Sequence, residues 1–133
     1  MLGMGLATGL VCGVGNDLFA TAQSIERVIC PKTNAFARYD EILSEVKTRV
    51  ESDTLIILAL GHTATVLAYD LAALGYQALD LGHIDVEYEW YRMGAKRKVA
   101  VPNKYVNEAP QGRIQEVSNL DKQYNSEIVA RIL

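Results

Sequence analysis

The order of apolar and polar residues along the chain predicts strands alternating with helices. Residues 55–60 are a continuous apolar run, LIILAL, which is typical of a strand buried on both faces in a parallel sheet. Residues 24–30 alternate loosely and end at Pro31, which predicts an earlier strand. Residues 76–81 form another short, mainly apolar run and predict a later one.

Apolar residues at intervals of three and four predict a helix after each of these strands. In the first helix the apolar face consists of Phe36, Tyr39, Ile42, Leu43, Val46 and Val50, with Asn34 as the expected N-cap. In the second it consists of Ala64, Leu67, Ala68, Leu71 and Leu74, with Gly75 just past the helix end. A third helix is expected to begin near Asp85 and to end at Gly94.

The resulting order, strand–helix repeated three times from residue 24, predicts an α/β fold. We expect a Rossmann-like three-layer domain with a mainly parallel sheet and right-handed crossovers. The three predicted strands would make up half of such a domain. Residues 1–12 are interpreted as a degraded or divergent start, residues 13–108 as the α/β domain, and residues 109–133 as a tail that packs on it. For residues 123–133 the pattern fits a strand or a short helix.

Composition and charge narrow the class of protein. The chain has 133 residues, 50% hydrophobic and 22% charged, as expected for one globular domain. Its formal net charge of −3 offers no basic face for nucleic acid, so no nucleic-acid partner is expected. Residues 1–15 hold no Lys or Arg and are too short to span a bilayer, so we expect neither a secretory signal nor a membrane span. Cys12 and Cys30 fit no metal or disulfide spacing, which favours reduced thiols and a cytoplasmic location.

Two glycine turns are candidate binding sites, because ligands bind beyond the carboxyl ends of strands in open α/β sheets. Gly61 ends the buried run and is followed by Thr63 and Thr65, so helix N–H groups and hydroxyls would face a phosphate there. The alternative is that Thr63, or the histidine before it, merely caps the helix. Gly15 and Asn16 belong to another turn, where the backbone can approach a ligand closely.

The segment HIDVEYE at residues 83–89 brings one imidazole and three carboxylates into seven positions. If a helix begins near Asp85, then Asp85 and Glu89 are neighbours on it and Glu87 is turned away. His83 would then lie in the loop at the end of the preceding strand. Three like charges are costly without a cation, a shared proton or a bound hydroxyl, which favours a functional role. The structural alternative is that these carboxylates only complement the helix dipole.

Several segments together suggest a family: GVGNDLF at residues 13–19, CPKTNAF at 30–36, YDEIL at 39–43, LGHTATVLAYDLAALGYQALDLGHIDVEYEW at 60–90 and KYVNE at 104–108. In this combination the chain resembles the C-terminal portion of the GT-D glycosyltransferases, bacterial enzymes long labelled a domain of unknown function. The resemblance implies sugar transfer from a nucleotide sugar, in the glycosylation of serine-rich adhesins. It also implies a Rossmann-like fold and a divalent metal, Mn²⁺ or Mg²⁺.

The resemblance implies roles for particular residues. His83 and Glu89 match a histidine and a glutamate of the family's active site, and the turn at residues 61–65 would lie near the nucleotide diphosphate. The family's metal motif is an Asp-x-Glu in the N-terminal half, so the metal ligands are expected outside this chain. Asp85-Val86-Glu87 spells the same motif in the other half, and no metal role is assigned to it. The chain departs from the family at His62, where a proline is usual.

The leading hypothesis is therefore a glycosyltransferase domain that transfers a hexose, taken to be glucose, from a UDP-linked sugar to a glycan or glycoprotein. In it Glu89 or Asp85 accepts the proton of the acceptor hydroxyl, and His83 orients the substrate or the diphosphate. The alternative is a non-catalytic module that binds nucleotide or pairs with a partner. An uncovered sheet edge would favour a homodimer.

Overall fold

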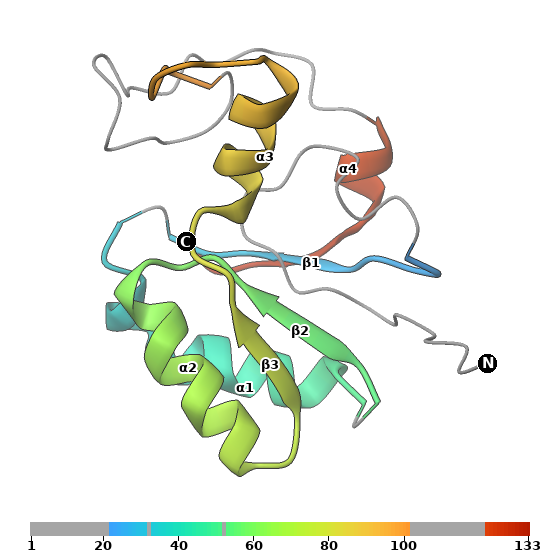
Figure 1. Ribbon diagram of the computed structural model, residues 1–133. Helices are drawn as coiled ribbons and strands as arrows, with labels where there is room; N and C mark the ends of the chain where they lie inside the picture. The colour runs from blue at the N-terminus through green and yellow to red at the C-terminus, as the bar shows by residue number, and fades with distance from the viewer. Residues whose placement is uncertain (1–21, 32, 52, 102–121) are drawn as a thin grey trace, which may run out of the picture.

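The computed structural model describes residues 22–31, 33–51, 53–101 and 122–133. Its elements, coloured along the chain in Figure 1, are β1 (Arg27–Ile29), the 3₁₀ helix η2 (Ala35–Arg38), α1 (Tyr39–Arg49), β2 (Leu55–Leu58), α2 (His62–Ala73), β3 (Gln77–Asp80), α3 (Ile84–Arg92), α4 (Lys122–Ser126) and β4 (Ile128–Arg131). The predicted alternation is confirmed from residue 24 to residue 94, with shorter strands than expected. The tail contains both a short helix and a strand. The predictions for Gly15, Asn16 and residues 1–12, and for the chain between 102 and 121, lie outside the described residues.

The strands of the described residues form two parallel pairs. β2 pairs with β3 in register, from Leu55 opposite Gln77 to Leu58 opposite Asp80. This β2–α2–β3 unit is the predicted parallel crossover. β1, however, pairs with β4 near the end of the chain. No hydrogen-bonded ladder joins the two pairs within the described part, and the expected Rossmann-like three-layer arrangement is not confirmed.

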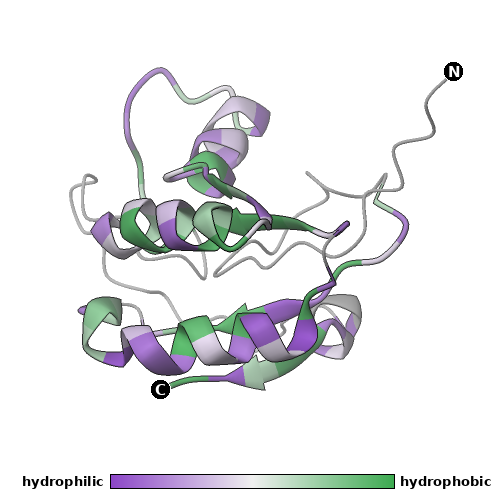
Figure 2. Cartoon of the chain, turned by 90° about the horizontal axis from the view of Figure 1, so that it is seen from below, coloured by the Kyte–Doolittle hydropathy of each residue, from purple (hydrophilic) through white to green (hydrophobic). Residues whose placement is uncertain are grey.

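The main core lies where α1 and α2 pack against the strands. Its buried residues are Val28, Cys30, Ala35, Ile42, Val46, Val50, Ile56, Leu58, Ala64, Leu67, Leu71 and Ile132. Successive residues of a strand point to opposite faces, so Ile57 packs separately, with Leu55 and Leu81. Figure 2 shows the apolar residues of the strands in green and the helices with polar and apolar residues interleaved. The prediction that both faces of β2 are covered is confirmed.

Three predictions for individual residues are wrong. Asn34 precedes η2 with φ 53°, but its side chain makes no capping hydrogen bond. Phe36 is 56% exposed, because the 3₁₀ turn that holds it has three residues per turn and shifts it off the apolar face of α1. Leu74 is 52% exposed, because it is the C-cap residue of α2 and lies past the last turn that packs on the core.

Glycines end α2 and α3 as expected. Gly75 follows the C-cap of α2 with φ 93°, a conformation that a side chain would strain. The N–H of Gly75 donates to the carbonyl of Ala72 and that of Tyr76 to the carbonyl of Leu71, both at 3.0 Å. These two bonds form a Schellman motif and satisfy carbonyls that the helix leaves unpaired. The same pair of bonds closes α3 at Gly94, which has φ 60°.

The described residues also bear on membrane association and on cysteine chemistry. None of their helices combines the length and the apolar character that crossing a bilayer requires. Cys30 is a buried thiol in the main core, with Sγ 3.8 Å from the carbonyl oxygen of Val28. Cys12 lies outside the described residues.

An ion pair joins β1 to the residue before β4. Arg27 Nε lies 2.7 Å from Glu127 Oε2, and the two side chains are only 3% and 14% exposed. The backbone N–H of Arg27 also donates to the carbonyl of Glu127 at 2.7 Å. Removing one member of a buried ion pair leaves the other charge without compensation in a place that water does not reach.

We therefore expect Glu127→Ala to lower the free energy of unfolding by roughly 3 kcal/mol, the cost typical of breaking a buried ion pair. The double variant Arg27→Met/Glu127→Leu removes both charges, so it should retain more stability than Glu127→Ala alone. Urea unfolding followed by circular dichroism measures all three proteins. Equal stability of Glu127→Ala and the wild type would show that this pair contributes nothing to the β1–β4 contact.

Tyr39 connects the start of α1 to α2. Its hydroxyl donates a hydrogen bond to the carboxylate of Asp70 on α2. Desolvation by burial and then this hydrogen bond raise the pKa of Tyr39 to about 12. Deprotonation would remove the donor and place a phenolate against a carboxylate.

The sign of the effect on stability follows from the raised pKa. Between pH 10, the ordinary tyrosine value, and about 12, folded Tyr39 keeps a proton that the unfolded chain loses. Stability is therefore expected to fall as the pH rises through this window, and Tyr39→Phe should remove that part of the fall. Urea unfolding of both proteins across the window is the measurement. If the free energy of unfolding depended on pH in the same way in both proteins, Tyr39 would not be the cause of the fall.

Candidate active site

The register of β2 and β3 brings two predicted turns to one edge of the sheet. Leu58 and Asp80, the last residues of the two strands, are paired. The N–H of Leu81 extends the pairing by donating to the carbonyl of Leu58 at 3.1 Å. The loop to α2 and the loop to α3 therefore begin side by side. Figure 1 shows α3 beyond the carboxyl ends of both strands.

Gly61 shapes the first of these turns. It is the N-cap residue of α2, with φ 55° and ψ −141°, and no side chain caps the helix. The alternative that Thr63 or His62 caps α2 is therefore wrong. The first N–H groups of a helix have no partner within it, so an uncapped start carries a partial positive charge and free donors. The absence of a capping side chain is compatible with the anion site that the sequence predicts at this turn.

The two threonines of the turn have different surroundings. Thr63 is buried, with 5% of its surface exposed. Thr65 is exposed, but its hydroxyl donates a hydrogen bond of 2.7 Å to Oδ2 of Asp80. A hydroxyl has one proton to donate, so in this arrangement Thr65 has none left for a phosphate. The structure thus gives Thr65 a partner within the protein instead of the expected free donor.

His83 stands at the start of α3. It is the N-cap residue, with φ −97° and ψ 33°, and its side chain makes no capping hydrogen bond. Its carbonyl accepts from the N–H groups of Val86 and Glu87, both at 2.9 Å. The side chain is exposed, so the imidazole at the sheet edge is open to a ligand. This is the loop position predicted for it.

The three carboxylates of α3 differ in burial according to the face of the helix on which they lie. Asp85 is buried, with 7% of its surface exposed, and Glu89 is half-buried one turn later on the same side. Glu87 is exposed on another face. Asp85 and Glu87 lie in the first turn, where negative charge complements the helix dipole. His83 and Glu89 are separated by about 9 Å of helix rise, at 1.5 Å per residue, and by about 120° around the helix axis.

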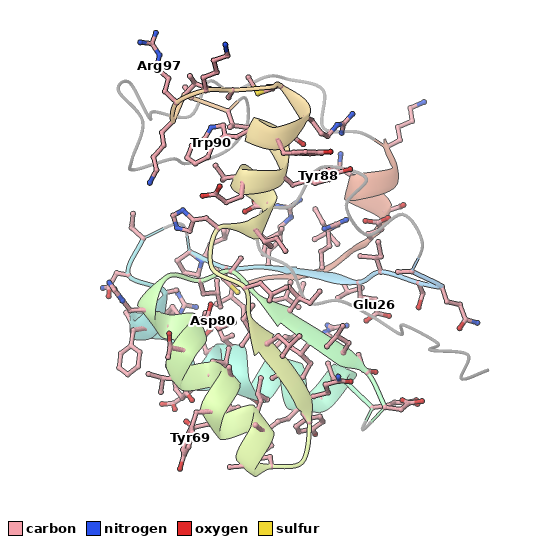
Figure 3. All side chains as sticks on the ribbon, in the orientation of Figure 1. Glu26, Tyr69, Asp80, Tyr88, Trp90 and Arg97 are labelled. Carbon is pink, nitrogen blue, oxygen red and sulfur yellow. The ribbon has the colours of Figure 1, made fainter. Side chains whose placement is uncertain are left out.

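Asp80 is a residue of this edge that sequence reasoning missed. Figure 3 labels it at the end of β3, beside the first turns of α2. Besides the bond from Thr65, its Oδ1 accepts the N–H of Gly82 at 3.0 Å. The available sequence signal was an acidic residue that ends a strand about 20 residues after a glycine turn, which is the spacing of ribose-binding acids in dinucleotide folds.

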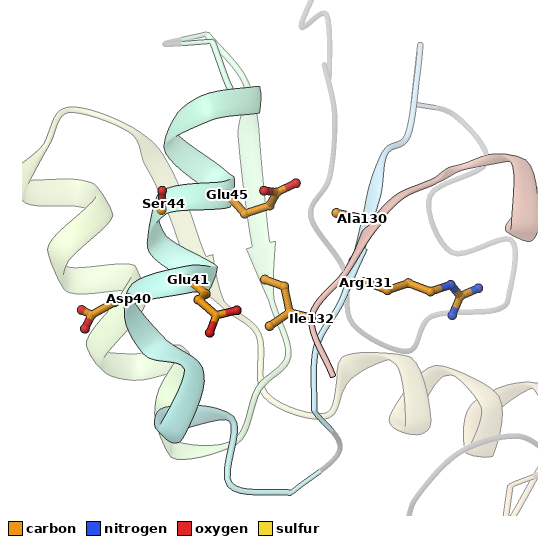
Figure 4. A pocket seen from close by; sticks show the side chains of 7 residues that line it. All are labelled: Asp40, Glu41, Ser44, Glu45, Ala130, Arg131 and Ile132. Carbon is orange, nitrogen blue, oxygen red and sulfur yellow. The ribbon is translucent and has the colours of Figure 1, made fainter.

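A separate open groove, of about 510 Å³, lies between α1 and β4 (Figure 4). Its lining comprises Asp40, Glu41, Ser44, Glu45, Ala130, Arg131 and Ile132. Arg38 pairs with Glu41 through two hydrogen bonds, which hold the pKa of Glu41 below its usual value, and Arg49 pairs with Glu45. The groove contains none of the candidate residues, and surface ion pairs account for two of its carboxylates.

Comparison with known proteins decides the family. A family model described as glycosyltransferase GT-D fold matches residues 8–109. The chain belongs to the GT-D glycosyltransferase family. The chain is 50% identical over 122 residues to glycosyltransferase GlyD of Streptococcus pneumoniae serotype 4 and 46% identical over 121 residues to the probable glycosyl transferase Gly of Streptococcus gordonii. The family resemblance of the sequence is confirmed.

Solved structures of the GT-D family agree with the fold. One, described as domain of unknown function 1792 with a distinct glycosyltransferase fold, is similar with a TM-score of 0.78 and 49% identity. Another, a glycosyltransferase of this domain type from Streptococcus sanguinis, has a TM-score of 0.79 and 45% identity. Each alignment covers 95% of this chain but only 46% and 47% of the solved chains. The alignments with the two curated relatives cover 91% and 90% of this chain, but only 15% and 17% of the relatives' own lengths.

The divalent metal expected for GT-D enzymes finds no fitting ligands in the described residues. No three or more of their His, Cys, Asp and Glu side chains come together as a metal site. Asp85 and Glu87, which spell the family's motif, lie two positions apart on α3 and about 200° apart around it. One is buried and the other exposed, so they cannot chelate one ion together. No step of the reaction is assigned to a metal on these residues.

Trp90 holds this part of the GT-D fold in place. It is 7% exposed and packs with Val86 and Val101, and its indole N–H donates to the carbonyl of Val99 at 2.8 Å. The ammonium of Lys98 lies 5.9 Å from the ring centre, within cation–π range. Trp90 thus has a core role. Tyr91, at the next helix position, points to solvent and is 82% exposed.

We expect Trp90→Phe to lower the free energy of unfolding by about 1–3 kcal/mol, the usual cost of leaving a buried acceptor unsatisfied. Tyr91→Phe is the matched control, since it changes an exposed ring on the same helix and should leave stability unaltered. Thermal unfolding of both variants is the measurement. A Trp90→Phe variant as stable as the Tyr91→Phe control would mean that the indole hydrogen bond does not anchor α3.

Proposed function

We propose that this chain forms part of a glycosyltransferase domain that transfers glucose from a UDP-linked sugar to a glycan or glycoprotein acceptor in the cytoplasm. The observation that carries the proposal is the meeting of an uncapped helix start, at Gly61, with the exposed His83 at one edge of a parallel strand pair. The names of the relatives support sugar transfer as the reaction class. The donor, the acceptor and the compartment are inferences from the family resemblance.

The start of α2 is the proposed site of the donor's diphosphate. Gly61 adopts a positive φ, and the helix that follows has no acidic residue in its first turn and no capping side chain. Its N–H groups would donate to the phosphate oxygens, and the helix dipole would stabilise the negative charge that grows as the diphosphate leaves. Thr63 contributes through its backbone in this arrangement, because its side chain is buried.

α3 and its N-cap residue are the proposed site of proton transfer. The acceptor's hydroxyl oxygen forms a bond to the anomeric carbon as the bond from that carbon to the diphosphate breaks. The hydroxyl proton passes to the carboxylate of Glu89, which is half-buried, in preference to that of the buried Asp85. His83, exposed at the helix start, orients the substrate or the diphosphate.

A non-catalytic role is the second candidate. It requires only the start of α2 at Gly61, where helix N–H groups can bind an anion without a metal. In this role the chain binds nucleotide without turning it over, or acts together with a partner. A second copy is a candidate partner, because β3 has only β2 beside it within the described residues and Leu79 on it is 42% exposed.

Release of UDP from UDP-glucose, in buffer with manganese and an acceptor glycan, separates the two candidates. Loss of a general base lowers the rate by on the order of 100-fold or more. The double variant His83→Ala/Glu89→Ala, which lacks the proposed base and the orienting histidine, should therefore release UDP at least that much more slowly than the wild type. Glu87→Gln is the matched control, because it removes an exposed charge from the same helix and should keep the wild-type rate.

The outcomes assign the function. A wild-type rate no higher than that of the double variant would overturn the catalytic proposal for this chain. A rise in melting temperature with UDP-glucose but without turnover would favour the non-catalytic nucleotide-binding role. The absence of both turnover and a thermal shift would overturn the two candidates together.

A further inference from the structure

The carboxylate of Asp80 bonds two segments that the proposed function requires to be close. Oδ2 accepts the hydroxyl proton of Thr65, in α2, at 2.7 Å, and Oδ1 accepts the N–H of Gly82, before α3, at 3.0 Å. Asp80 itself ends β3 and is paired with Leu58 at the end of β2. One side chain therefore connects β3 to the turn after β2 and to the turn after β3.

The second of these bonds acts on a residue with few alternatives. Gly82 has φ 55°, a conformation that only a glycine adopts readily, and His83 follows it as the N-cap of α3. A hydrogen bond to the N–H of Gly82 restrains the rotation of the chain at this point. The direction in which His83 leaves the strand thus depends on the position of the Asp80 carboxylate.

The first bond also changes the electrostatics of the α2 start. α2 has no acidic residue in its own first turn. Asp80 places a negative charge beside that turn through space, where it complements the helix dipole. A diphosphate at the same helix start would be repelled by this charge if it approached from the Thr65 side. The Gly61 side is therefore left as the favourable approach for a phosphate.

We propose that Asp80 is a positioning residue that sets the α2 start and the His83 turn at the relative positions needed to bind the nucleotide sugar. The inference rests on the proposed function and adds to it a residue outside the family pattern described above. Asp80 acts through Thr65 and Gly82 and need not touch the substrate. A carboxylate is suited to this because each of its two oxygens accepts one of the bonds, whereas an amide offers one accepting oxygen only.

Three variants test the role. Asp80→Ala removes both acceptors, whereas an asparagine could keep both contacts by donating its amide N–H to the Thr65 hydroxyl. Thr65→Val keeps the shape of the threonine without its hydroxyl, and Thr65→Ser keeps the hydroxyl. We expect Asp80→Ala and Thr65→Val to weaken UDP-glucose binding about tenfold, which is the usual effect of losing one hydrogen bond to a charged group. Thr65→Ser should bind nearly as the wild type, and Glu87→Gln controls for the loss of one negative charge nearby.

Two measurements keep the outcomes distinct. Calorimetric titration with UDP-glucose reports affinity, and amide hydrogen exchange of the protein without ligand reports the bond at Gly82. Faster exchange at Gly82 and His83 in Asp80→Ala, together with weaker binding, is the expected result. Unchanged exchange would overturn the connection to Gly82, and faster exchange with unchanged affinity would overturn its role in binding.

The result for the wild type separates this inference from the proposed function. A wild-type chain that binds no UDP-glucose would overturn the proposed function, and with it a role for Asp80 in that site. A wild-type chain that binds, with Asp80→Ala and Thr65→Val binding equally well, would overturn the positioning role alone. A deficit in Thr65→Ser as large as that in Thr65→Val would show that the hydroxyl is not the group that matters.

Discussion

The parallel pairing of β2 with β3 is the contact on which the candidate site depends. Parallel strands must be joined by a crossover, and here α2 supplies it, with Leu67 and Leu71 fully buried in the main core. The pairing places the carboxyl ends of both strands at one edge. Two loops that are about 20 residues apart in sequence thereby become neighbours. Without this pairing Gly61 and His83 would have no reason to share a ligand.

Apolar burial and polar contacts stabilise different parts of the structure around that edge. The apolar contacts lie behind it, in the core under α1 and α2 and in the small cluster around Trp90. The polar contacts lie at the edge itself, where Asp80 joins Thr65 to Gly82. Polar groups that must meet a ligand cannot be held by apolar burial, since that would remove them from water. Hydrogen bonds to a neighbouring carboxylate can hold such groups while they remain accessible.

Membership of the GT-D family connects this edge to sugar transfer, and the relatives are longer than this chain. The chain corresponds to a little under half of the solved GT-D chains. In the described residues the edge offers helix N–H groups and an exposed imidazole, and α3 carries a half-buried carboxylate. The proposed function uses the N–H groups to bind a diphosphate and the carboxylate to take a proton.

Local pattern determined the elements of this protein, and the tertiary structure decided their partners. Apolar spacing and glycines are enough to place β2, α2 and α3, because helix and strand periods and left-handed turns are properties of neighbouring residues. The same pattern placed His83 in the loop before a helix and Glu89 on that helix, as they are in the structure. It could not pair β1 with β4, because their contact joins distant parts of the chain and depends on a buried ion pair. Nor could the local pattern show that Asp80 accepts a hydrogen bond from the Thr65 hydroxyl, since that bond exists only once the strands have paired.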